Sequence, residues 1–366
     1  MRMITLSAAL AALTASGNAK EIYVSPTGTG TGTSTSPYGS IQSAVNAAAA
    51  GDVIYLRAGT YKPNTNIQIK KSGTRTQPMI LRSYTKEKVI LDGESLPGTP
   101  YELDASLPKA ERGILHIEGG NYWKFYNLEL TNGPYSVYAR DASHNYYELL
   151  STHDNYESGF KLQGASSNNT VIYLDSYRNR DPRKNSQSAD GFACKEGSGE
   201  GNSLRNARLW DNVEGGLDLY MFGKPVTMEE VYAWGNGFNR WGFSDFNGDG
   251  NGFKLGITDN PPANHIIRNF RWLSRMPRRA SSTMATQALT ANIAVAIAGS
   301  QVSLTDSGIL ASGNSWNSGT WSNSSFKSVD PSTLKGARGA DGRVPASDFL
   351  IPVSGAAIGA TTRADM

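Results

Sequence analysis

The sequence feature that most constrains the fold is a repeated short strand that ends on asparagine. Five segments with alternating apolar residues end at Asn132, Asn155, Asn179, Asn212 and Asn236, which lie 23, 24, 33 and 24 residues apart. A second short strand that opens on glycine follows each asparagine, at an offset that varies from 1 to 16 residues. A period of about 24 residues with fixed corners and one loop of variable length is typical of a parallel β-helix. The patterns of leucine-rich and propeller repeats are both missing.

The repeat predicts an all-β chain folded as a single-stranded parallel β-helix. Asparagines stacked at one corner can bond to one another and tolerate left-handed backbone, so we expect an asparagine ladder. Residues 40–47 have helical spacing and good helix formers, and strand-like residues resume at 51–56. We expect this N-terminal helix to cap the first coil, because an open coil exposes its core and its strand edges.

The first residues are typical of a secretory signal peptide. Met1 and Arg2 precede a short apolar run, and small residues follow that run up to Ala19. We therefore expect cleavage after residue 19, export of the protein, and a mature domain that spans residues 20–366. The alternative is that this segment is a short buried helix.

Composition excludes several other classes of protein. The net charge is only +3 with 18% charged residues, which argues against a strongly basic nucleic-acid binder. A membrane-spanning transporter is excluded because no run of about 18 apolar residues occurs in the sequence. The single cysteine, Cys194, excludes an internal disulfide framework and a multi-cysteine zinc site. We expect a monomer that binds neither nucleic acid nor a membrane.

Charged residues gather where the glycine-led strands are expected to stack. Residues at equal offset from these glycines form columns, with a spacing of about 4.8 Å between coils. Asp190, Glu214 and Asp218 then converge on neighbouring coils, and Lys254 lies one coil beyond Asp218. Carboxylates held this close repel unless a cation lies among them, and oxygen ligands favour Ca²⁺. The alternative is that these residues are ordinary solvated acids at the turns of a β-helix.

Lys254 is a candidate base. It follows the glycine-rich run 247–252, where backbone and ligand could approach each other closely. The unperturbed pKa of lysine is about 10.4, so this side chain needs a lowered pKa or an alkaline medium to accept a proton. The alternative is an exposed lysine on an ordinary strand.

Several long runs of the sequence resemble one known family. These are Ser188–Gly197, Gly216–Phe222, Trp234–Phe243 and Gly248–Gly256, and together they closely resemble the pectate lyases of polysaccharide lyase family 9. The resemblance extends over about residues 20–270. It implies a right-handed parallel β-helix that cleaves polygalacturonate by β-elimination.

The resemblance also implies roles for individual residues. The Brønsted base of the family matches Lys254, and its calcium-binding aspartates match Asp190, Glu214, Gly215 and Asp218. Two of these positions depart from aspartate, because Glu214 has a longer side chain and Gly215 has no carboxylate at all. Calcium affinity is expected to fall with the number of charged ligands.

Two other functions remain open at this point. A β-helix glycoside hydrolase of pectin would use Asp190 and Asp218 as its two carboxylates, but it would leave Lys254 without a role. A non-catalytic β-helix that binds carbohydrate is the second alternative, because one aspartate of the calcium set is missing. Elimination alone creates a conjugated double bond, so its ultraviolet absorbance distinguishes the three.

One stretch, at about residues 276–298, departs from the repeat. Residues 276–290 contain no asparagine, glycine or aromatic residue, although the preceding coils use all three. Synonymous codons for this run, read in another frame, can encode the Gly-Phe opening of a further coil. We therefore hypothesise two compensating frameshifts with local disorder of the stack, and the alternative is a genuine loop or linker. The nucleotide sequence decides between them.

Overall fold

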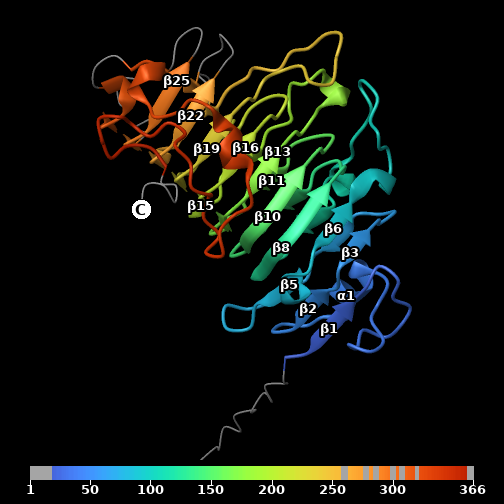
Figure 1. The fold of residues 1–366 in the computed structure, drawn as a ribbon. Helices are drawn as coiled ribbons and strands as arrows, with labels where there is room; N and C mark the ends of the chain where they lie inside the picture. Colours follow the sequence, from blue (N-terminus) through green and yellow to red (C-terminus); the bar gives the residue numbers. More distant parts are fainter. Residues whose placement is uncertain are drawn as a thin grey trace, which may run out of the picture.

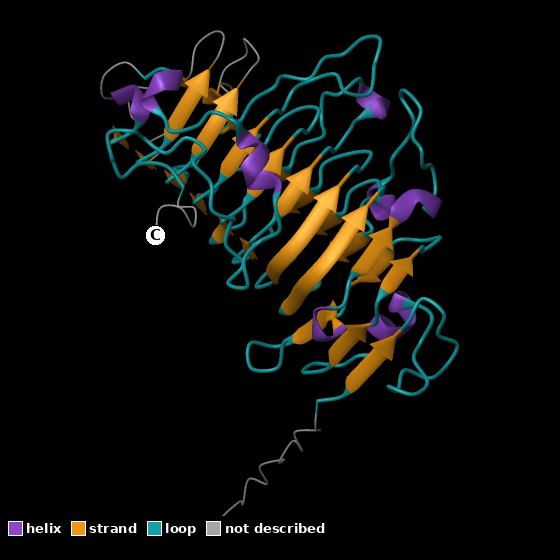
Figure 2. Cartoon of the chain, in the orientation of Figure 1, coloured by secondary structure: helices purple, strands orange, loops and turns teal. Residues whose placement is uncertain are grey.

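The structure is a computed structural model, in which the chain winds into a stack of short strands (Figure 1). Loops leave the corners of the stack, and short helical turns lie among these loops (Figure 2). Every pairing between the named strands is parallel. The structure describes residues 19–256, 263–274, 280–282, 288–296, 302–304, 310–317 and 321–360.

One face of the coil is a seven-stranded sheet. Its strands are β4 (Ile67–Ile69), β7 (Leu115–Glu118), β9 (Val137–Arg140), β11 (Phe160–Gly164), β14 (Phe192–Gly197), β17 (Leu217–Asp218) and β20 (Phe253–Lys254). Two further strands, β23 (Ala280–Ser282) and β26 (Val302–Leu304), pair with each other.

The other faces belong to an 18-stranded sheet. It consists of two strips joined by the long strands β8 and β10, each of which pairs with two successive strands of a neighbouring coil. Its strands are β1 (Glu21–Val24), β2 (Val53–Leu56), β3 (Gly59–Tyr61), β5 (Met79–Ser83), β6 (Val89–Asp92), β8 (Trp123–Thr131), β10 (Tyr146–His153), β12 (Thr170–Ile172), β13 (Asp175–Tyr177), β15 (Asn202–Arg205), β16 (Arg208–Trp210), β18 (Val226–Glu229), β19 (Tyr232–Trp234), β21 (Ile266–Arg268), β22 (Arg271–Ser274), β24 (Ala288–Thr290), β25 (Ile293–Ala296) and β27 (Leu310–Ser312).

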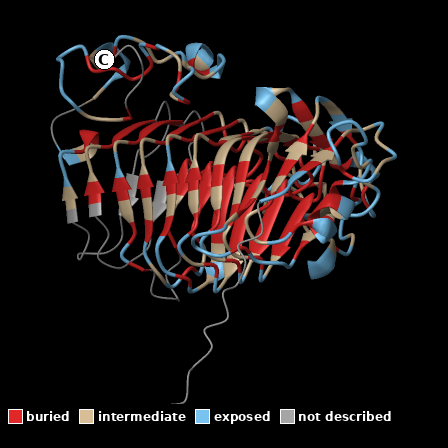
Figure 3. Ribbon diagram, turned by 90° about the horizontal axis from the view of Figure 1, so that it is seen from below, coloured by how far each residue is buried: buried red, intermediate tan, exposed pale blue. Residues whose placement is uncertain are grey.

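Apolar side chains from successive turns fill the interior of the coil. Figure 3 shows buried residues along the strands of the stack. On the seven-stranded sheet, Phe160, Phe192, Leu217 and Phe253 occupy equivalent inward positions of successive coils. The rings of Phe160 and Phe192 stack with centroids 5.6 Å apart. Burial of each such side chain contributes about 2 kcal/mol. Because side chains alternate along a strand, the next residue of each strand faces outward.

The predicted asparagine ladder forms a buried column at one corner of the coil. The side-chain amide nitrogens of Asn155, Asn179 and Asn212 each donate to the next side-chain oxygen of the series, which continues to Asn236, at 2.7, 2.8 and 3.1 Å. Each donor side chain is fully buried, so these bonds satisfy polar groups that water cannot reach. The repeat therefore holds for four of the five predicted asparagines.

The first predicted asparagine, Asn132, lies one residue before the ladder position. Because Thr131 pairs with His153, Asn132 stands opposite Asp154, and the backbone N–H of Gly133 donates to Asn155. Asn132 bonds to Asp92 outside the ladder. The pairing of Val137 with Phe160 likewise shows that Gly133 does not occupy the glycine position of the later coils. Residue counting missed the shift because the ladder position of this coil, two residues after Thr131, is occupied by Gly133 and not by an asparagine.

A second asparagine ladder, which the sequence did not reveal, is continued by a buried histidine. Asn145, Asn169 and Asn202 form this ladder, and the register places Val226 and then His265 at its next two positions. The Nδ1 atom of the fully buried His265 accepts a hydrogen bond from Val226 N at 3.2 Å. Burial lowers the pKa of His265 to about 4.

We expect His265 to make the fold sensitive to acid. In the unfolded chain His265 is protonated below about pH 6.5, whereas in the folded chain its ring stays neutral down to about pH 4. Stability is therefore fully present above pH 6.5 and falls by about 3 kcal/mol as the pH drops through this window. The variant His265→Asn keeps an acceptor for Val226 N and should lose this part of the pH dependence in urea unfolding experiments. An unchanged slope in the variant would assign the acid sensitivity to other groups.

The predicted cap is helix α1 (Ile41–Ala47), which buries Ile41, Ala44 and Val45. The hydroxyl of Ser40 accepts a hydrogen bond from Ser43 N and so caps the helix at its N-terminus. Short 3₁₀ turns occur at Tyr84–Lys86, Gly93–Ser95, Lys109–Glu111, Pro182–Lys184, Ser315–Asn317, Asn323–Ser325 and Pro331–Lys335. Within the described residues, no helix is long and apolar enough to cross a membrane.

The C-terminal segment lies along the outside of the coil. Phe326, Leu334 and Phe349 belong to a buried cluster with Trp210 and Trp234, which point outward from β16 and β19. Ion pairs tie the same segment to the coil, because the Asp175 carboxylate binds the guanidinium groups of both Arg208 and Arg338. This covering segment was not predicted.

The irregular stretch at 276–298 is described at residues 280–282 and 288–296. There β24 pairs with β21 and β25 pairs with β22, so these residues continue the parallel coil. The other residues of the stretch lie outside the described part, as do residues 1–18 of the predicted signal peptide. The frameshift hypothesis concerns the gene and stays a prediction.

Candidate active site on the seven-stranded sheet

The outer face of the seven-stranded sheet carries a column of polar residues. The register aligns Lys161, Ala193, Asp218 and Lys254 on successive strands, one position after the stacked inward residues. Asp190 and Glu214 lie in the turns that precede β14 and β17. The register therefore brings the predicted acids and the predicted lysine to one face.

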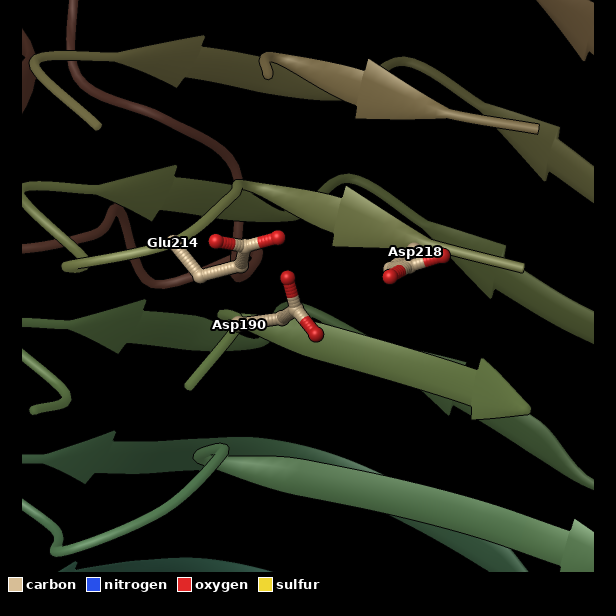
Figure 4. A group of neighbouring side chains, drawn as sticks. All are labelled: Asp190, Glu214 and Asp218. Atoms are coloured by element: carbon tan, nitrogen blue, oxygen red, sulfur yellow. The ribbon is translucent and has the colours of Figure 1, made fainter. Parts of the chain in front are cut away.

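Three of the predicted residues form a compact carboxylate cluster. One oxygen from each of Asp190, Glu214 and Asp218 lies within 4.8 Å of the others (Figure 4). Their exposed fractions are 1, 3 and 1%. Backbone N–H groups hold two of them, because Asp249 N donates to Glu214 at 2.9 Å and Tyr220 N donates to Asp218 at 2.8 Å.

The cluster is electrostatically strained. Burial raises the pKa of Asp190 to about 7, the charge of Lys195 opposes this rise, and the charge of Asp218 adds to it. Burial also raises the pKa of Glu214 well above its usual range, and Asp190 and Asp249 contribute. Buried carboxylates of this kind remain ionised only where a cation lies close by.

Lys195 supplies one such cation. Its Nζ atom lies 2.7 Å from Asp190 Oδ2 and 2.6 Å from Asp218 Oδ2. Burial disfavours the ammonium form, but the two carboxylates outweigh this effect and raise the pKa of Lys195 well above its ordinary value. The sequence analysis did not select Lys195. The alternation of β14 contained the signal, because Phe192 and Cys194 face the core and so direct Ala193 and Lys195 outward.

Lys254 lies at the edge of the cluster and retains access to solvent. Its Nζ atom is 3.8 Å from Asp218, 4.0 Å from Glu214 and 3.5 Å from Asp249, and 20% of its side chain is exposed. Burial lowers the pKa of Lys254, but the charges of Asp218 and Glu214 outweigh burial, so the pKa is raised. The side chain is therefore an ammonium ion while these carboxylates keep their charge.

The donor set fits a hard divalent cation. Three carboxylates converge, and the buried Oδ1 atom of Asp190 has no hydrogen-bond partner within the described structure. Carboxylate oxygens are the ligands that Ca²⁺ prefers in proteins. Gly215, at the fourth predicted position, has no side chain to offer, although an added Cβ would lie 3.0 Å from Asp190 Oδ1.

We expect Gly215→Asp to tighten Ca²⁺ binding by about tenfold or more, because affinity rises with ligand charge. A side chain at this position points toward Asp190, and the backbone of Gly215 does not have a positive φ. Isothermal titration calorimetry measures the change, and Gly215→Ala is the matched control, since it adds the Cβ without a carboxylate. Equal affinity in the two variants would show that residue 215 does not face the ion.

The fold first defines the class of protein, because the chain is a parallel β-helix that carries a carboxylate cluster and a partly exposed lysine on one sheet. The chain belongs to the family described as "Pel9A-like, right handed beta helix region", which matches residues 22–272. This membership confirms the expected right-handed parallel β-helix.

Relatives with known names indicate which kind of enzyme the chain is. The chain is 52% identical over 399 aligned positions to pectate lyase PEL9 of Emericella nidulans, with 96% of this chain and 97% of that protein covered. It is 36% identical over 255 positions to pectate lyase L of Dickeya chrysanthemi, which covers 67% of this chain and 57% of that protein. The chain is therefore a polysaccharide lyase.

One solved structure agrees with this assignment, and a second shares the fold. The crystal structure of pectate lyase Pel9A matches with a TM-score of 0.73 and 29% identity, and the match covers 92% of this chain and 90% of that chain. A rhamnogalacturonan lyase matches with the same TM-score at 20% identity over 92% of this chain and 97% of that chain, which shows the shared fold alone.

Proposed function

We propose that this chain is a secreted, calcium-dependent pectate lyase that cleaves polygalacturonate by β-elimination with Lys254 as the base. The observation that carries the proposal is the position of Lys254, whose partly exposed ammonium lies 3.8 Å from a buried carboxylate cluster. The naming of the relatives as pectate lyases supports the substrate. Secretion rests on the signal-like residues 1–19, which precede the domain of residues 20–366.

Asp190, Glu214 and Asp218 are the residues that would hold calcium. A bound Ca²⁺ would supply positive charge beside the uronate carboxylate, which stabilises the enolate-like state that forms when the C5 proton leaves. The backbone bonds from Asp249 and Tyr220 orient two of these carboxylates before any ligand arrives. Preorganised ligands of this kind lower the cost of binding.

Lys254 is positioned to move the proton. Its neutral Nζ accepts the proton from C5, the C5–H electron pair forms the C4–C5 double bond, and the C4–O bond breaks. The departing sugar oxygen takes its proton from water. Asp218 and Glu214 hold the amine at the edge of the cluster, where its side chain retains access to solvent.

The same contacts set the conditions for this chemistry. Because the pKa of Lys254 is raised by Asp218 and Glu214, the amine is protonated near neutral pH. The base therefore needs an alkaline medium, or neutralisation of these two carboxylates, before it can accept a proton. The sequence had left these conditions open.

The direct test is incubation of the purified protein with polygalacturonate, read by the ultraviolet absorbance of the conjugated product. We expect absorbance to rise, EDTA to stop the rise, and added Ca²⁺ to restore it. Highly methylated pectin should react more slowly, because only a free carboxylate can bind the metal. New reducing ends without ultraviolet absorbance would indicate hydrolysis, and binding without cleavage would indicate a carbohydrate-binding module.

The geometry does not favour the hydrolase alternative. The two acids that it would need, Asp190 and Asp218, are each only 1% exposed and both bind Lys195. Neither is open to a glycosidic oxygen in this arrangement. We also expect the enzyme to act as a monomer, which size-exclusion chromatography would check.

A further inference from the structure

We propose that Lys195 is a built-in counter-cation that competes with the divalent ion for the carboxylates of Asp190 and Asp218. This inference rests on the calcium site of the proposed function and adds a residue that controls its affinity. The ammonium must leave the cluster before the ion can bind. The enzyme would therefore respond to calcium over a higher concentration range than its three carboxylates alone would set.

The contacts of Lys195 define the competition. Its Nζ atom lies at 2.7 and 2.6 Å from one oxygen of each aspartate, which is the range of strong charge-assisted hydrogen bonds. A calcium ion needs carboxylate oxygens at about 2.3–2.6 Å. An ion that used the same two oxygens would lie within a few ångströms of the ammonium, where like charges repel strongly in a buried site.

The local sequence explains why Lys195 reaches the cluster. Phe192 and Cys194 face the core, so Ala193 and Lys195 lie on the outer face of the sheet, where Ala193 pairs with Asp218 of β17. Ala193 is fully buried although it faces outward, and its small side chain leaves room beside Asp218. The pairing of β11 with β14 also shifts register after Leu162, which is where Lys195 leaves the regular ladder.

Lys161 provides a natural contrast on the same face. It faces outward from β11, where it pairs with Ala193, and it is slightly more buried than Lys195, with 10% of the Lys161 side chain and 12% of the Lys195 side chain exposed. Its Nζ atom binds Glu196 at 3.4 Å and makes no ion pair with the cluster among the described contacts. The position of the ammonium, and not merely a buried lysine on this sheet, therefore distinguishes Lys195.

The charges of the cluster predict how removal of the Lys195 charge changes the affinity for calcium. With three ionised carboxylates, the ammonium groups of Lys195 and Lys254 leave the cluster with a single net negative charge. Removing the Lys195 charge makes the cluster more negative and frees two aspartate oxygens. The apparent affinity of a site is reduced by the fraction of molecules in which it is blocked, so removal of the blocking group tightens binding.

The test is calorimetric titration of Ca²⁺ into the wild-type protein and into Lys195→Met, which keeps the length of the side chain and removes its charge. We expect Lys195→Met to bind Ca²⁺ at least about tenfold more tightly, and to show a larger rise in unfolding temperature on adding Ca²⁺. Lys195→Arg and Lys161→Met should stay within about threefold of the wild type. Unchanged or weaker binding by Lys195→Met would overturn the proposal.

A second measurement uses the wild-type protein and does not depend on any variant folding. Amine acetylation followed by mass spectrometry should modify Lys195 faster when Ca²⁺ is present, whereas the exposed Lys224 should react equally in both states. Slower or unchanged labelling of Lys195 would contradict displacement. EDTA-sensitive elimination together with unchanged affinity in Lys195→Met would sink this inference alone. Calcium-independent elimination would instead contradict the proposed function.

Discussion

The variant Lys254→Ala is expected to lower kcat for elimination on polygalacturonate by about 10³-fold, because a positioned general base contributes about 10²–10⁴-fold. The loss should appear in kcat, since the amine acts on the C5 proton and the carboxylate cluster that would hold calcium is left intact. Calcium titration of the variant should therefore still show binding. The measurement is the rate of ultraviolet absorbance at alkaline pH and saturating Ca²⁺.

Chemical rescue makes this prediction specific to a base. Alanine leaves space beside Asp218, so a small primary amine such as ethylamine should restore part of the activity of Lys254→Ala. The control is Lys224→Ala, which removes an exposed lysine that binds Glu200 at 2.8 Å and should keep its activity. Substantial activity in Lys254→Ala without added amine would reject the assignment of the base.

The fold was predictable where each coil repeats the same corner. The asparagine position persists through Asn155, Asn179, Asn212 and Asn236 because a fully buried corner needs a side chain that both donates and accepts. The same reasoning failed at Asn132, because Gly133 occupies the ladder position of this coil and Asn132 lies one residue before it. Counting along the chain cannot detect a shift that only strand pairing defines.

The covering segment at the C-terminus was unpredictable for a related reason. Trp210 and Trp234 end strands whose alternation gives no sign that their outer side is covered. Their cover comes from Phe326 and Phe349, more than 90 residues away and outside the repeat. Periodic patterns report contacts between neighbouring coils, whereas this contact joins the coil to a segment with no period.

The sequence was enough to predict those features of the candidate site that depend only on the register of the strands. Equal offsets from Gly191, Gly216 and Gly252 were enough to align Asp218 with Lys254. Register cannot say where a long flexible side chain ends, and Lys195 turns back from the end of β14 toward Asp190. The alternation of β14 therefore indicates only that Lys195 faces outward, and its contacts with both aspartates are defined by the three-dimensional structure.

The variant Asp218→Asn is expected to weaken Ca²⁺ binding by about 10²-fold and to lower activity at limiting Ca²⁺ to a similar extent. Asn keeps the volume of the side chain and an oxygen to accept the 2.8 Å bond from Tyr220 N, so the turn should be preserved. It removes the charge that faces both Lys195 and Lys254. Calcium affinity falls with the charge of its ligands, which gives the direction of the effect.

Loss of the Asp218 charge weakens the binding of calcium more than it weakens the binding of the Lys195 ammonium. A divalent ion interacts with each carboxylate about twice as strongly as an ammonium does, so Asp218→Asn should favour Lys195 over calcium at Asp190. Raising the Ca²⁺ concentration should therefore recover much of the activity of Asp218→Asn, whereas it should not rescue Lys254→Ala. The control is Glu196→Gln, which neutralises an acid on the neighbouring strand β14 that binds Lys161 instead. Wild-type calcium dependence in Asp218→Asn would place the ion outside this cluster.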